Sequence, residues 1–281
     1  MILIADSGST KTTWSLVNTD DGSSETLQTL GINPMYQDEN TIFDLINKDF
    51  THPLPEAVNI YFYGAGCINQ SVNETVRSAL NRFFQCQYLL VDTDLMAAAR
   101  SLCREKEGIA CILGTGSNSC YYDGYMIKNN VSPLGYMLGD EGSGAVIGRK
   151  FIGDLLKSQL PEHIREKFFK IYGITPSLIM DHVYKKPFPN RFLAQFTHFI
   201  RDNIHEPALK KIVKTSFIEF FDRNIRQYPE ALRLPINFVG SVAYYFREIL
   251  EESASDSGFV PGEVALSPME GLIQYHLYHN L

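Results

Sequence analysis

The sequence lacks any concentrated block of basic residues and any long apolar run. Its 281 residues include 25 Lys and Arg against 32 Asp and Glu, a formal net charge of −7. Nucleic acid and anionic membranes both select positive surfaces, so the composition disfavours both partners. No apolar stretch approaches the roughly 20 residues that span a bilayer, and Met1–Asp6 lacks the basic region of a signal peptide. We therefore expect a cytoplasmic protein.

Paired cysteines are also missing. The five cysteines are odd in number, contain no C-x-x-C pair, and stand at Cys67, Cys86, Cys103, Cys111 and Cys120. This pattern disfavours a disulfide framework or a zinc site and is typical of reduced, buried thiols. The N-x-S/T triplets at Asn69, Asn73 and Asn130 carry no weight in a cytosolic chain.

Neither a G-x-x-x-x-G-K-[S/T] loop nor a G-x-G-x-x-G fingerprint occurs, so two common nucleotide motifs are excluded. The chain instead begins with an apolar strand, Ile2–Ala5, a small polar turn from Asp6 to Thr10, and a β-rich run from Thr12 to Val17. The same pattern returns at Ile109–Leu113, Gly114–Asn118 and Ser119–Tyr122. We interpret this repeat as an internal duplication that predicts two related α/β halves.

The remaining elements fit this division. Strands are expected at 58–63, 88–91 and 236–239, and helices at 41–50, 72–84, 95–104, 243–252 and from Met269 onward. A mainly helical segment is expected from about 151 to 232, with its phenylalanine stripes in the core. We predict an N-terminal domain from 1–105 plus 268–281, to which the last helix returns, and a C-terminal domain from 106–267.

The two small-residue turns suit phosphate oxygens, because backbone N–H groups and hydroxyls converge on such a turn without a strongly charged surface. Lys11 adds a cation, and Asp6 at the strand end suits a hydrated Mg²⁺. One polar hairpin turn is weak evidence. Two matched turns, facing each other across a cleft, would hold one polyphosphate from both sides.

The motifs, in order, resemble those of the BadF/BadG-type ATPase family and its N-acetylglucosamine kinase branch, within the actin/hexokinase-like ATPases. The matching stretches are Asp6–Thr12, Gly31–Pro34, Val91–Ala98, Leu113–Asn118, Gly135–Gly144, Val239–Val242 and Ser267–Gly271. The resemblance implies an α/β fold of duplicated ribonuclease-H-like domains facing a central cleft, with a helical insertion in the second and ATP between the domains.

The resemblance also implies roles. ATP and Mg²⁺ are the expected cofactors, and Asp6 is the expected metal residue. The nucleotide-binding positions are Asp6, Gly8, Ser9, Thr10, Lys11 and Thr12 in the first motif, Thr115, Gly116 and Ser117 in the second, and Gly240 and Ser241 in the adenosine motif. Two positions depart from the family pattern, since Ser7 and Ser241 stand where glycine is usual.

Asp94 matches the carboxylate that takes the proton from the attacking sugar hydroxyl. Its place after a strand and before a helix suits an α/β active site. The same place suits a helix N-cap, and Asp92 is the nearest competing base. Substrate contacts are expected at Asn33, Gly64, Ala65, Asn118, Gly135 and Asp140. Asn33 could instead be a turn residue, and Asp140 part of a helix N-cap region.

We therefore expect an ATP-dependent sugar kinase that phosphorylates an amino sugar, first N-acetylglucosamine and next glucosamine. Two alternatives stay open at this point. One is an ATPase activator of an iron–sulfur dehydratase, which would need cysteines for a cluster. The other is a non-catalytic sugar or nucleotide sensor. A homodimer built on the helical segment also stays open.

Overall fold

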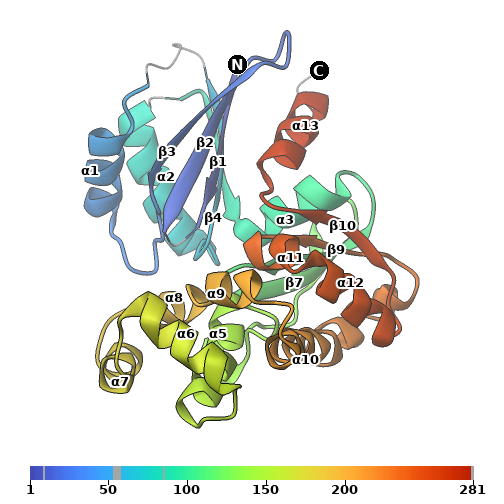
Figure 1. Cartoon of the computed structure of the whole chain (residues 1–281). Coiled ribbons are helices and arrows are strands. Elements are labelled where there is room, and N and C mark those ends of the chain that lie inside the picture. Colours follow the sequence, from blue (N-terminus) through green and yellow to red (C-terminus); the bar gives the residue numbers. More distant parts are fainter. Residues whose placement is uncertain (9, 53–57, 85, 280–281) are drawn as a thin grey trace. The chain divides into compact units, whose positions relative to one another are not determined.

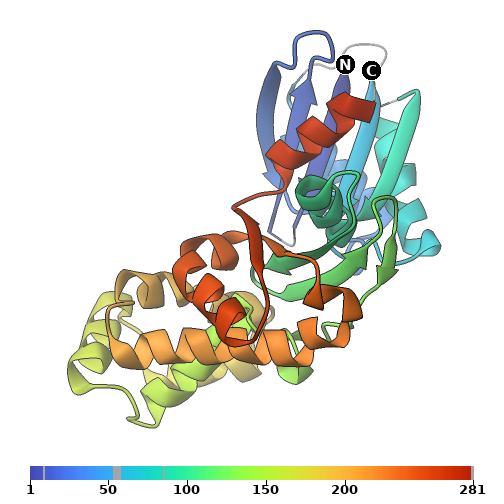
Figure 2. The same cartoon turned by 90° about the vertical axis from the view of Figure 1, so that its right-hand side faces the viewer.

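The computed structural model describes residues 1–281 except 9, 53–57, 85 and 280–281. The chain divides into two compact units, which Figures 1 and 2 show with their elements. Unit 1 comprises Met1–Lys106, Gly124–Met126 and Ser267–Leu281, and unit 2 comprises Glu107–Asp123 and Ile127–Leu266. Each unit is built on its own five-stranded sheet.

The sheet of unit 1 has the order β3-β2-β1-β4-β5. Its strands are β1 (Ile2–Ser7), β2 (Lys11–Val17), β3 (Ser24–Leu30), β4 (Asn59–Gly64) and β5 (Tyr88–Thr93). Strand β1 pairs antiparallel with β2 and parallel with β4, β2 pairs antiparallel with β3, and β4 pairs parallel with β5. The carboxyl ends of β1, β3, β4 and β5 therefore lie at one edge of the sheet.

Helices cover both faces of this sheet (Figure 1). They are α1 (Glu39–Asp49), α2 (Gln70–Phe84), α3 (Asp94–Cys103) and α13 (Met269–His279). Leu3 and Ala5 of β1 pack in one core with Ile42 of α1 and Val76 of α2. On the other face, the ring of His276 in α13 lies 3.8 Å from that of Tyr61. Successive strand residues alternate between these two faces.

Unit 2 repeats the topology, with the order β10-β9-β6-β7-β8. Its strands are β6 (Gly108–Leu113), β7 (Ser117–Tyr122), β8 (Ile127–Asn129), β9 (Ile236–Val239) and β10 (Pro261–Ala265). Strand β6 takes the place of β1, since it pairs antiparallel with β7 and parallel with β9. The predicted duplication is confirmed at the level of strand order and direction.

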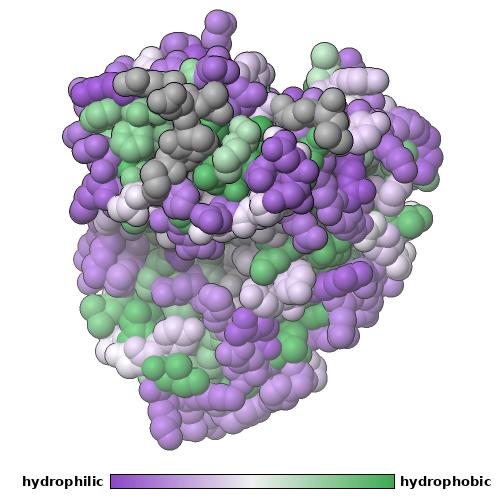
Figure 3. All heavy atoms as spheres, turned by 90° about the horizontal axis from the view of Figure 1, so that it is seen from above, coloured by the Kyte–Doolittle hydropathy of each residue, from purple (hydrophilic) through white to green (hydrophobic). Residues whose placement is uncertain are grey.

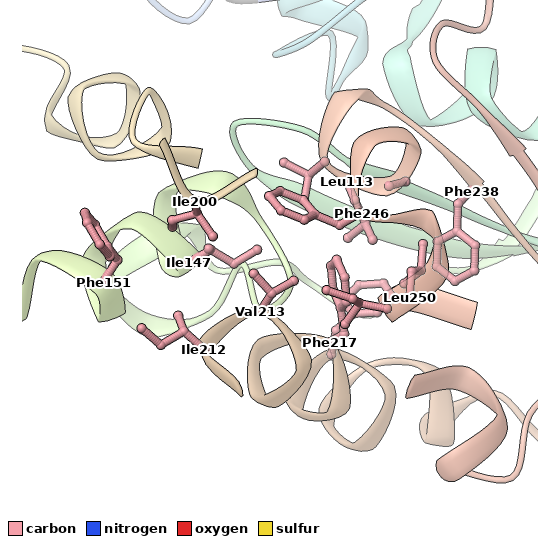
Figure 4. Packing of buried hydrophobic residues seen from close by; sticks show 14 of the residues in the cluster. Leu113, Ile147, Phe151, Ile200, Ile212, Val213, Phe217, Phe238, Phe246 and Leu250 are labelled. Atoms are coloured by element: carbon pink, nitrogen blue, oxygen red, sulfur yellow. The ribbon is translucent and has the colours of Figure 1, made fainter. Parts of the chain in front are cut away.

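The remaining helices belong to unit 2. They are α4 (Gly135–Leu138), α5 (Gly144–Leu156), α6 (Glu162–Tyr172), α7 (Pro176–Tyr184), α8 (Pro189–Ala194), α9 (Thr197–Asp202), α10 (Pro207–Arg223), the 3₁₀ turns η1 (Ile225–Gln227) and η2 (Pro229–Leu232), α11 (Ser241–Tyr245) and α12 (Arg247–Asp256). Figure 4 shows the core that joins them to the sheet, where Leu113 and Phe238 meet Ile147, Phe217 and Leu250. The predicted phenylalanine stripes lie largely in this core.

The surface mixes polar and apolar side chains. In the face shown in Figure 3, hydrophobic residues form separate small areas among hydrophilic ones. Within the described part of the chain, every helix is too short or too polar to cross a bilayer.

Candidate active site

The turn between β1 and β2 is closed by a hydrogen bond from Gly8 N–H to the Lys11 carbonyl, 3.0 Å long. Thr10 and Lys11 are exposed and available to a ligand, whereas Ser9 lies outside the described residues. Thr12 is fully buried, and its hydroxyl donates to the Leu30 carbonyl at 3.1 Å. The backbone of this turn and Lys11 thus suit phosphate, while the Thr12 hydroxyl is already used inside the fold.

Ser7 ties this turn to the loop that follows β3. Its buried Oγ lies 2.7 Å from the Thr12 hydroxyl, donates to the Ile32 carbonyl at 3.0 Å and accepts from Ile32 N–H at 3.0 Å. Glycine at this position has no hydroxyl group and could make none of these contacts with Thr12 and Ile32. The departure from the family pattern therefore joins the phosphate turn to the loop that carries Asn33.

We expect Ser7→Ala to lower the free energy of unfolding by about 1–3 kcal/mol, because it leaves buried polar groups of Ile32 unsatisfied. Ser15 is a matched control in the neighbouring strand. Its hydroxyl is equally buried and has no hydrogen-bond partner within the described residues. Ser15→Ala should be neutral or stabilising in urea unfolding. Equal losses in the two variants would contradict the bridging role of Ser7.

The loop after β3 places Asn33 against the turn after β4. The Asn33 side-chain oxygen accepts from Met35 N–H at 3.0 Å, and its carbonyl accepts from Tyr36 N–H at 3.1 Å, so Asn33 does serve as a turn residue. Gly66 has φ +87°, and a Cβ there would overlap the Asn33 side-chain oxygen. The oxygen of the Asn33 side-chain amide is therefore engaged in the turn. The NH₂ group of the same amide is the part that can donate to a sugar oxygen.

Asp94 and the turn after β4 meet the first turn at the same edge. Ser7 is in register with Gly64, and Gly64 with Thr93, the residue before Asp94. Ala65 N–H donates to the Ser7 carbonyl at 2.8 Å. The structure thus gathers four sequence-predicted positions, Asp6, Gly64, Ala65 and Asp94, at one end of the unit 1 sheet.

The N-cap of α3 is Thr93, whose hydroxyl accepts from Met96 N–H at 3.0 Å. Asp94 is the first residue of the helix. The alternative reading of Asp94 as the capping residue is therefore wrong, because the neighbouring threonine supplies the cap. The Asp94 carboxylate is left for another role.

Asp6 and Asp94 are two half-buried carboxyl groups that share this edge. Burial, and then the negative charge of Asp94, raise the pKa of Asp6 to about 7, while Lys11 acts in the opposite direction. Burial also raises the pKa of Asp94, with backbone N–H groups partly offsetting the shift. A carboxylate of raised pKa is a better proton acceptor than an exposed one.

Asp92 differs from Asp94 because it has a cation nearby. Burial raises the pKa of Asp92, but the N–H of Thr93, at 2.8 Å, and the Arg100 guanidinium both lower it. Register places Asp6, Tyr63 and Asp92 in one row across β1, β4 and β5. Asp92 is thus part of a charge-compensated cluster, whereas at Asp94 the shift toward a higher pKa comes from burial and is opposed by backbone N–H groups.

Tyr63 is the centre of that cluster. Its hydroxyl accepts from Arg100 at 2.8 Å and lies 2.8 Å from Nε2 of His276 in α13. The Arg100 guanidinium also lies 5.4 Å from the ring of Tyr275. Burial, and then Arg100, lower the pKa of His276 to about 3, so the imidazole is neutral where it meets the Tyr63 hydroxyl.

The donor set at this edge fits Mg²⁺. Two half-buried carboxyl groups that repel each other are stabilised by a divalent cation, and Mg²⁺ commonly takes one or two carboxylates plus water and phosphate oxygens. Within the described ranges, no group of three or more His, Cys, Asp or Glu residues could form a protein-only metal cage. Of the five cysteines, all but Cys86 are buried.

Asp6 should make the stability of the metal-free protein depend on pH. The pKa of Asp6 in the folded protein is about 7, above its ordinary value of 3.8. The stability that this shift contributes is therefore fully present below pH 3.8 and is lost as the pH rises through about 7. We expect Asp6→Asn to raise the melting temperature at about pH 8 but not at about pH 4. Mg²⁺-ATP should stabilise the wild type more than this variant. An equal gain in both proteins would argue against Asp6 as the Mg²⁺ residue.

In unit 2 the second turn is tied to the start of α5. The Gly114 and Thr115 carbonyls accept from Gly144 N–H at 2.8 Å and Ala145 N–H at 3.1 Å. Thr115 is exposed, and Gly116 is half-buried. Ser117 is buried, and its N–H points to the Asp140 carboxylate at 3.4 Å. The turn therefore has a fixed backbone with Asp140 beside it.

Asp140 adopts φ +54°, a left-handed conformation that is costly for aspartate and is typical of functional sites. The N-cap of α5 is Ser143, whose hydroxyl accepts from Val146 N–H at 3.2 Å, so the capping role does not fall on Asp140. Burial, and then the charge of Glu141, raise the pKa of Asp140 to about 6 despite the Ser117 N–H. Glu141 is paired with Arg223 at 2.6 Å.

Gly135 and Gly240 also have positive φ angles, of +73° and +123°. Gly135 is exposed, and a Cβ there would meet open space. Gly240 follows β9, and a Cβ there would overlap the Leu113 carbonyl. Ser241 is exposed at the start of α11. The close approach of Gly240 to the β6 backbone explains why glycine is needed at the position of the adenosine motif.

Solved structures resemble this chain over its whole length. A protein of Porphyromonas gingivalis, described as a candidate N-acetylglucosamine kinase, is 48% identical, with a TM-score of 0.95 and 100% of both chains covered. The chain belongs to the N-acetylglucosamine kinase branch of the BadF/BadG-type ATPase family. Neither a protein-family model nor a curated protein sequence matches it.

Two more distant structures share the fold of this family member. A candidate N-acetylglucosamine kinase of Chromobacterium violaceum is 16% identical, with a TM-score of 0.71 and 98% of each chain covered. A glucokinase of the ROK family from Streptomyces griseus, in complex with glucose and AMPPNP, is 14% identical, with a TM-score of 0.53 and 97% of each chain covered. The fold of duplicated ribonuclease-H-like domains is thereby confirmed.

Sequence reasoning missed several residues that shape the site. In the sequence, Ser7 stands out only as a departure from the family pattern. Arg100 is the single charged residue in α3 after Asp94, and it lies between alanine and serine. A lone arginine in an otherwise apolar helix is a signal that it has a specific partner. Tyr63 and His276 are 213 positions apart, and no local pattern could have paired them.

Proposed function

We propose that this protein transfers the γ-phosphoryl group of ATP to a hydroxyl of an amino sugar, with N-acetylglucosamine as the preferred acceptor. The observation that carries the proposal is the full-length similarity, at 48% identity, to a candidate N-acetylglucosamine kinase. The half-buried carboxylates of unit 1 and the fixed polar turn of unit 2 support it, because phosphoryl transfer depends mainly on positioning and electrostatics.

Each unit would contribute its own residues to nucleotide binding. In unit 1, the backbone at Gly8, the Thr10 hydroxyl and Lys11 would bind phosphate oxygens, and Ser9 belongs to the same motif. In unit 2, Thr115, Gly116 and Ser117 would bind phosphate, and Gly240 and Ser241 would lie against the adenosine. Mg²⁺, held by Asp6, would neutralise phosphate charge when bound.

The chain's own residues would also orient and deprotonate the sugar. Asp94 would accept the proton from the attacking hydroxyl, a role that suits its raised pKa. Asn33, Gly64 and Ala65 in unit 1, and Asn118, Gly135 and Asp140 in unit 2, would contact sugar oxygens. Asn and Asp together supply donors and acceptors for hydroxyl groups.

The test is ADP release with Mg²⁺-ATP across N-acetylglucosamine, glucosamine, N-acetylmannosamine and glucose. We expect the highest kcat/KM for N-acetylglucosamine. A folded protein that binds ATP but releases no ADP with any of these sugars would refute the kinase function. Preference for glucose would retain the kinase but refute the amino-sugar assignment.

A further inference from the structure

The side-chain amide of Asn118 is held in one orientation. Its Oδ1 accepts from Ser119 N–H at 2.9 Å and from Nδ2 of Asn130 at 2.8 Å. A backbone N–H can only donate, so the atom that faces it must be the amide oxygen. The NH₂ group of Asn118 is therefore on the opposite side of the amide, and no acceptor for it is found within the described residues.

The same reasoning fixes the orientation of the Asn130 side-chain amide. Its Nδ2 donates to the Ser119 carbonyl at 2.7 Å and to the Val131 carbonyl at 3.2 Å, besides its bond to Asn118. Carbonyls can only accept, which fixes the NH₂ group of Asn130 toward Asn118. An exposed asparagine just after β8 thus holds the Asn118 amide in this orientation together with the Ser119 N–H.

A buried tyrosine supports this arrangement from the core of unit 2. The Tyr228 hydroxyl donates to the Ser119 carbonyl at 2.9 Å and accepts from Val131 N–H at 2.8 Å. It also lies 3.0 Å from the Ser119 hydroxyl. The two residues whose carbonyls orient Asn130 are therefore themselves anchored, and the position of Asn130 is rigidly defined.

We propose that Asn130 is a positioning residue for sugar recognition, because with the Ser119 N–H it keeps the Asn118 NH₂ group turned outward as a donor to a sugar oxygen. The inference rests on the proposed kinase function. Asp140, an acceptor, lies beside the same strand through its contact with Ser117 N–H at 3.4 Å. A donor and an acceptor together match a hydroxyl, which accepts one hydrogen bond and donates another.

The first test compares Asn130→Ala with Asn129→Ala. Asn129 is the adjacent exposed asparagine, and no described side-chain hydrogen bond involves it. We expect Asn130→Ala to raise the KM for N-acetylglucosamine about ten-fold, as a misoriented donor does, while the KM for ATP changes less than about two-fold. Asn129→Ala should match the wild type. If Asn130→Ala changed the KM for N-acetylglucosamine and the KM for ATP equally, or changed neither, the inference would be overturned.

The second test is Asn118→Asp. Aspartate keeps an oxygen that accepts from Ser119 and Asn130 and replaces only the outward NH₂ by a carboxylate oxygen. We expect the KM for N-acetylglucosamine to rise at least ten-fold, because the new carboxylate oxygen cannot donate to a sugar oxygen. A KM for N-acetylglucosamine equal to that of the wild type would sink the inference.

Titration calorimetry with N-acetylglucosamine alone separates this inference from the kinase function. ADP release by the wild type decides the function, while the ratio of sugar affinities between wild type and variants decides the role of Asn130. A wild type that binds the sugar but releases no ADP would refute the kinase, and an Asn130→Ala affinity equal to that of the wild type would refute the positioning role.

Discussion

We expect Asp94→Asn to reduce kcat by about a thousand-fold or more while the protein stays folded, because asparagine cannot accept the proton of the sugar hydroxyl. The substitution preserves the size of the side chain. It also leaves the start of α3 intact, since Thr93 provides the N-cap. The measurement is ADP release at saturating sugar and ATP, with circular dichroism to establish folding. The KM for the sugar should change little.

Asp92→Asn is the matched control. Asp92 is two residues away on the same strand end, but its charge is compensated by Arg100. We expect it to lose less than about ten-fold in kcat and to unfold at lower temperature, since a buried guanidinium would lose its nearby carboxylate. If Asp92→Asn lowered kcat more than Asp94→Asn did, the roles of the two carboxylates would have to be exchanged.

Gly240→Ala should both destabilise unit 2 and weaken ATP binding. Gly240 has φ +123°, and an added Cβ would overlap the Leu113 carbonyl just before the second turn. Because a backbone carbonyl cannot move aside cheaply, we expect a loss of about 3 kcal/mol or more in the free energy of unfolding. The displaced turn should raise the KM for ATP more than the KM for the sugar.

Gly258→Ala is a control that separates two costs of the Gly240→Ala substitution: the overlap with the Leu113 carbonyl and the strain of placing alanine at a positive φ angle. Gly258 also has positive φ, at +85°, but a Cβ there would meet open space. We expect this control to lose only about 1 kcal/mol in urea unfolding and to keep its affinity for ATP. Similar losses in the two variants would show that the contact with Leu113 does not matter.

The strand order of both units could be predicted because its signals are local. The apolar run Ile2–Ala5, the small polar turn and the β-rich run Thr12–Val17 recur from Ile109 onward, and strand pairing follows from that repeat. Asp6 and Asp94 could be placed together because parallel strands bring their carboxyl ends to one edge. These features depend on position along a strand, which the sequence shows directly.

The supporting hydrogen bonds could not be predicted in this way. Ser7 reaches Ile32 across 25 positions and Arg100 reaches Tyr63 across 37, and neither spacing belongs to a helix or a hairpin. Asn130 was visible only as part of an N-x-S triplet, a pattern with no bearing on its contact with Asn118. Such pairings depend on side-chain packing within a finished unit, which composition and periodicity do not encode.

The return of α13 to the first sheet has a consequence for the order of folding during synthesis. All of unit 2 is translated before Met269–His279 emerges to pack on the face that presents Tyr61 and Tyr63. Unit 2 can therefore complete its core first, while one face of the unit 1 sheet is covered by α3 alone. This reverses the usual N-terminal-first sequence on the ribosome and makes unit 1 the part that nascent-chain chaperones would protect.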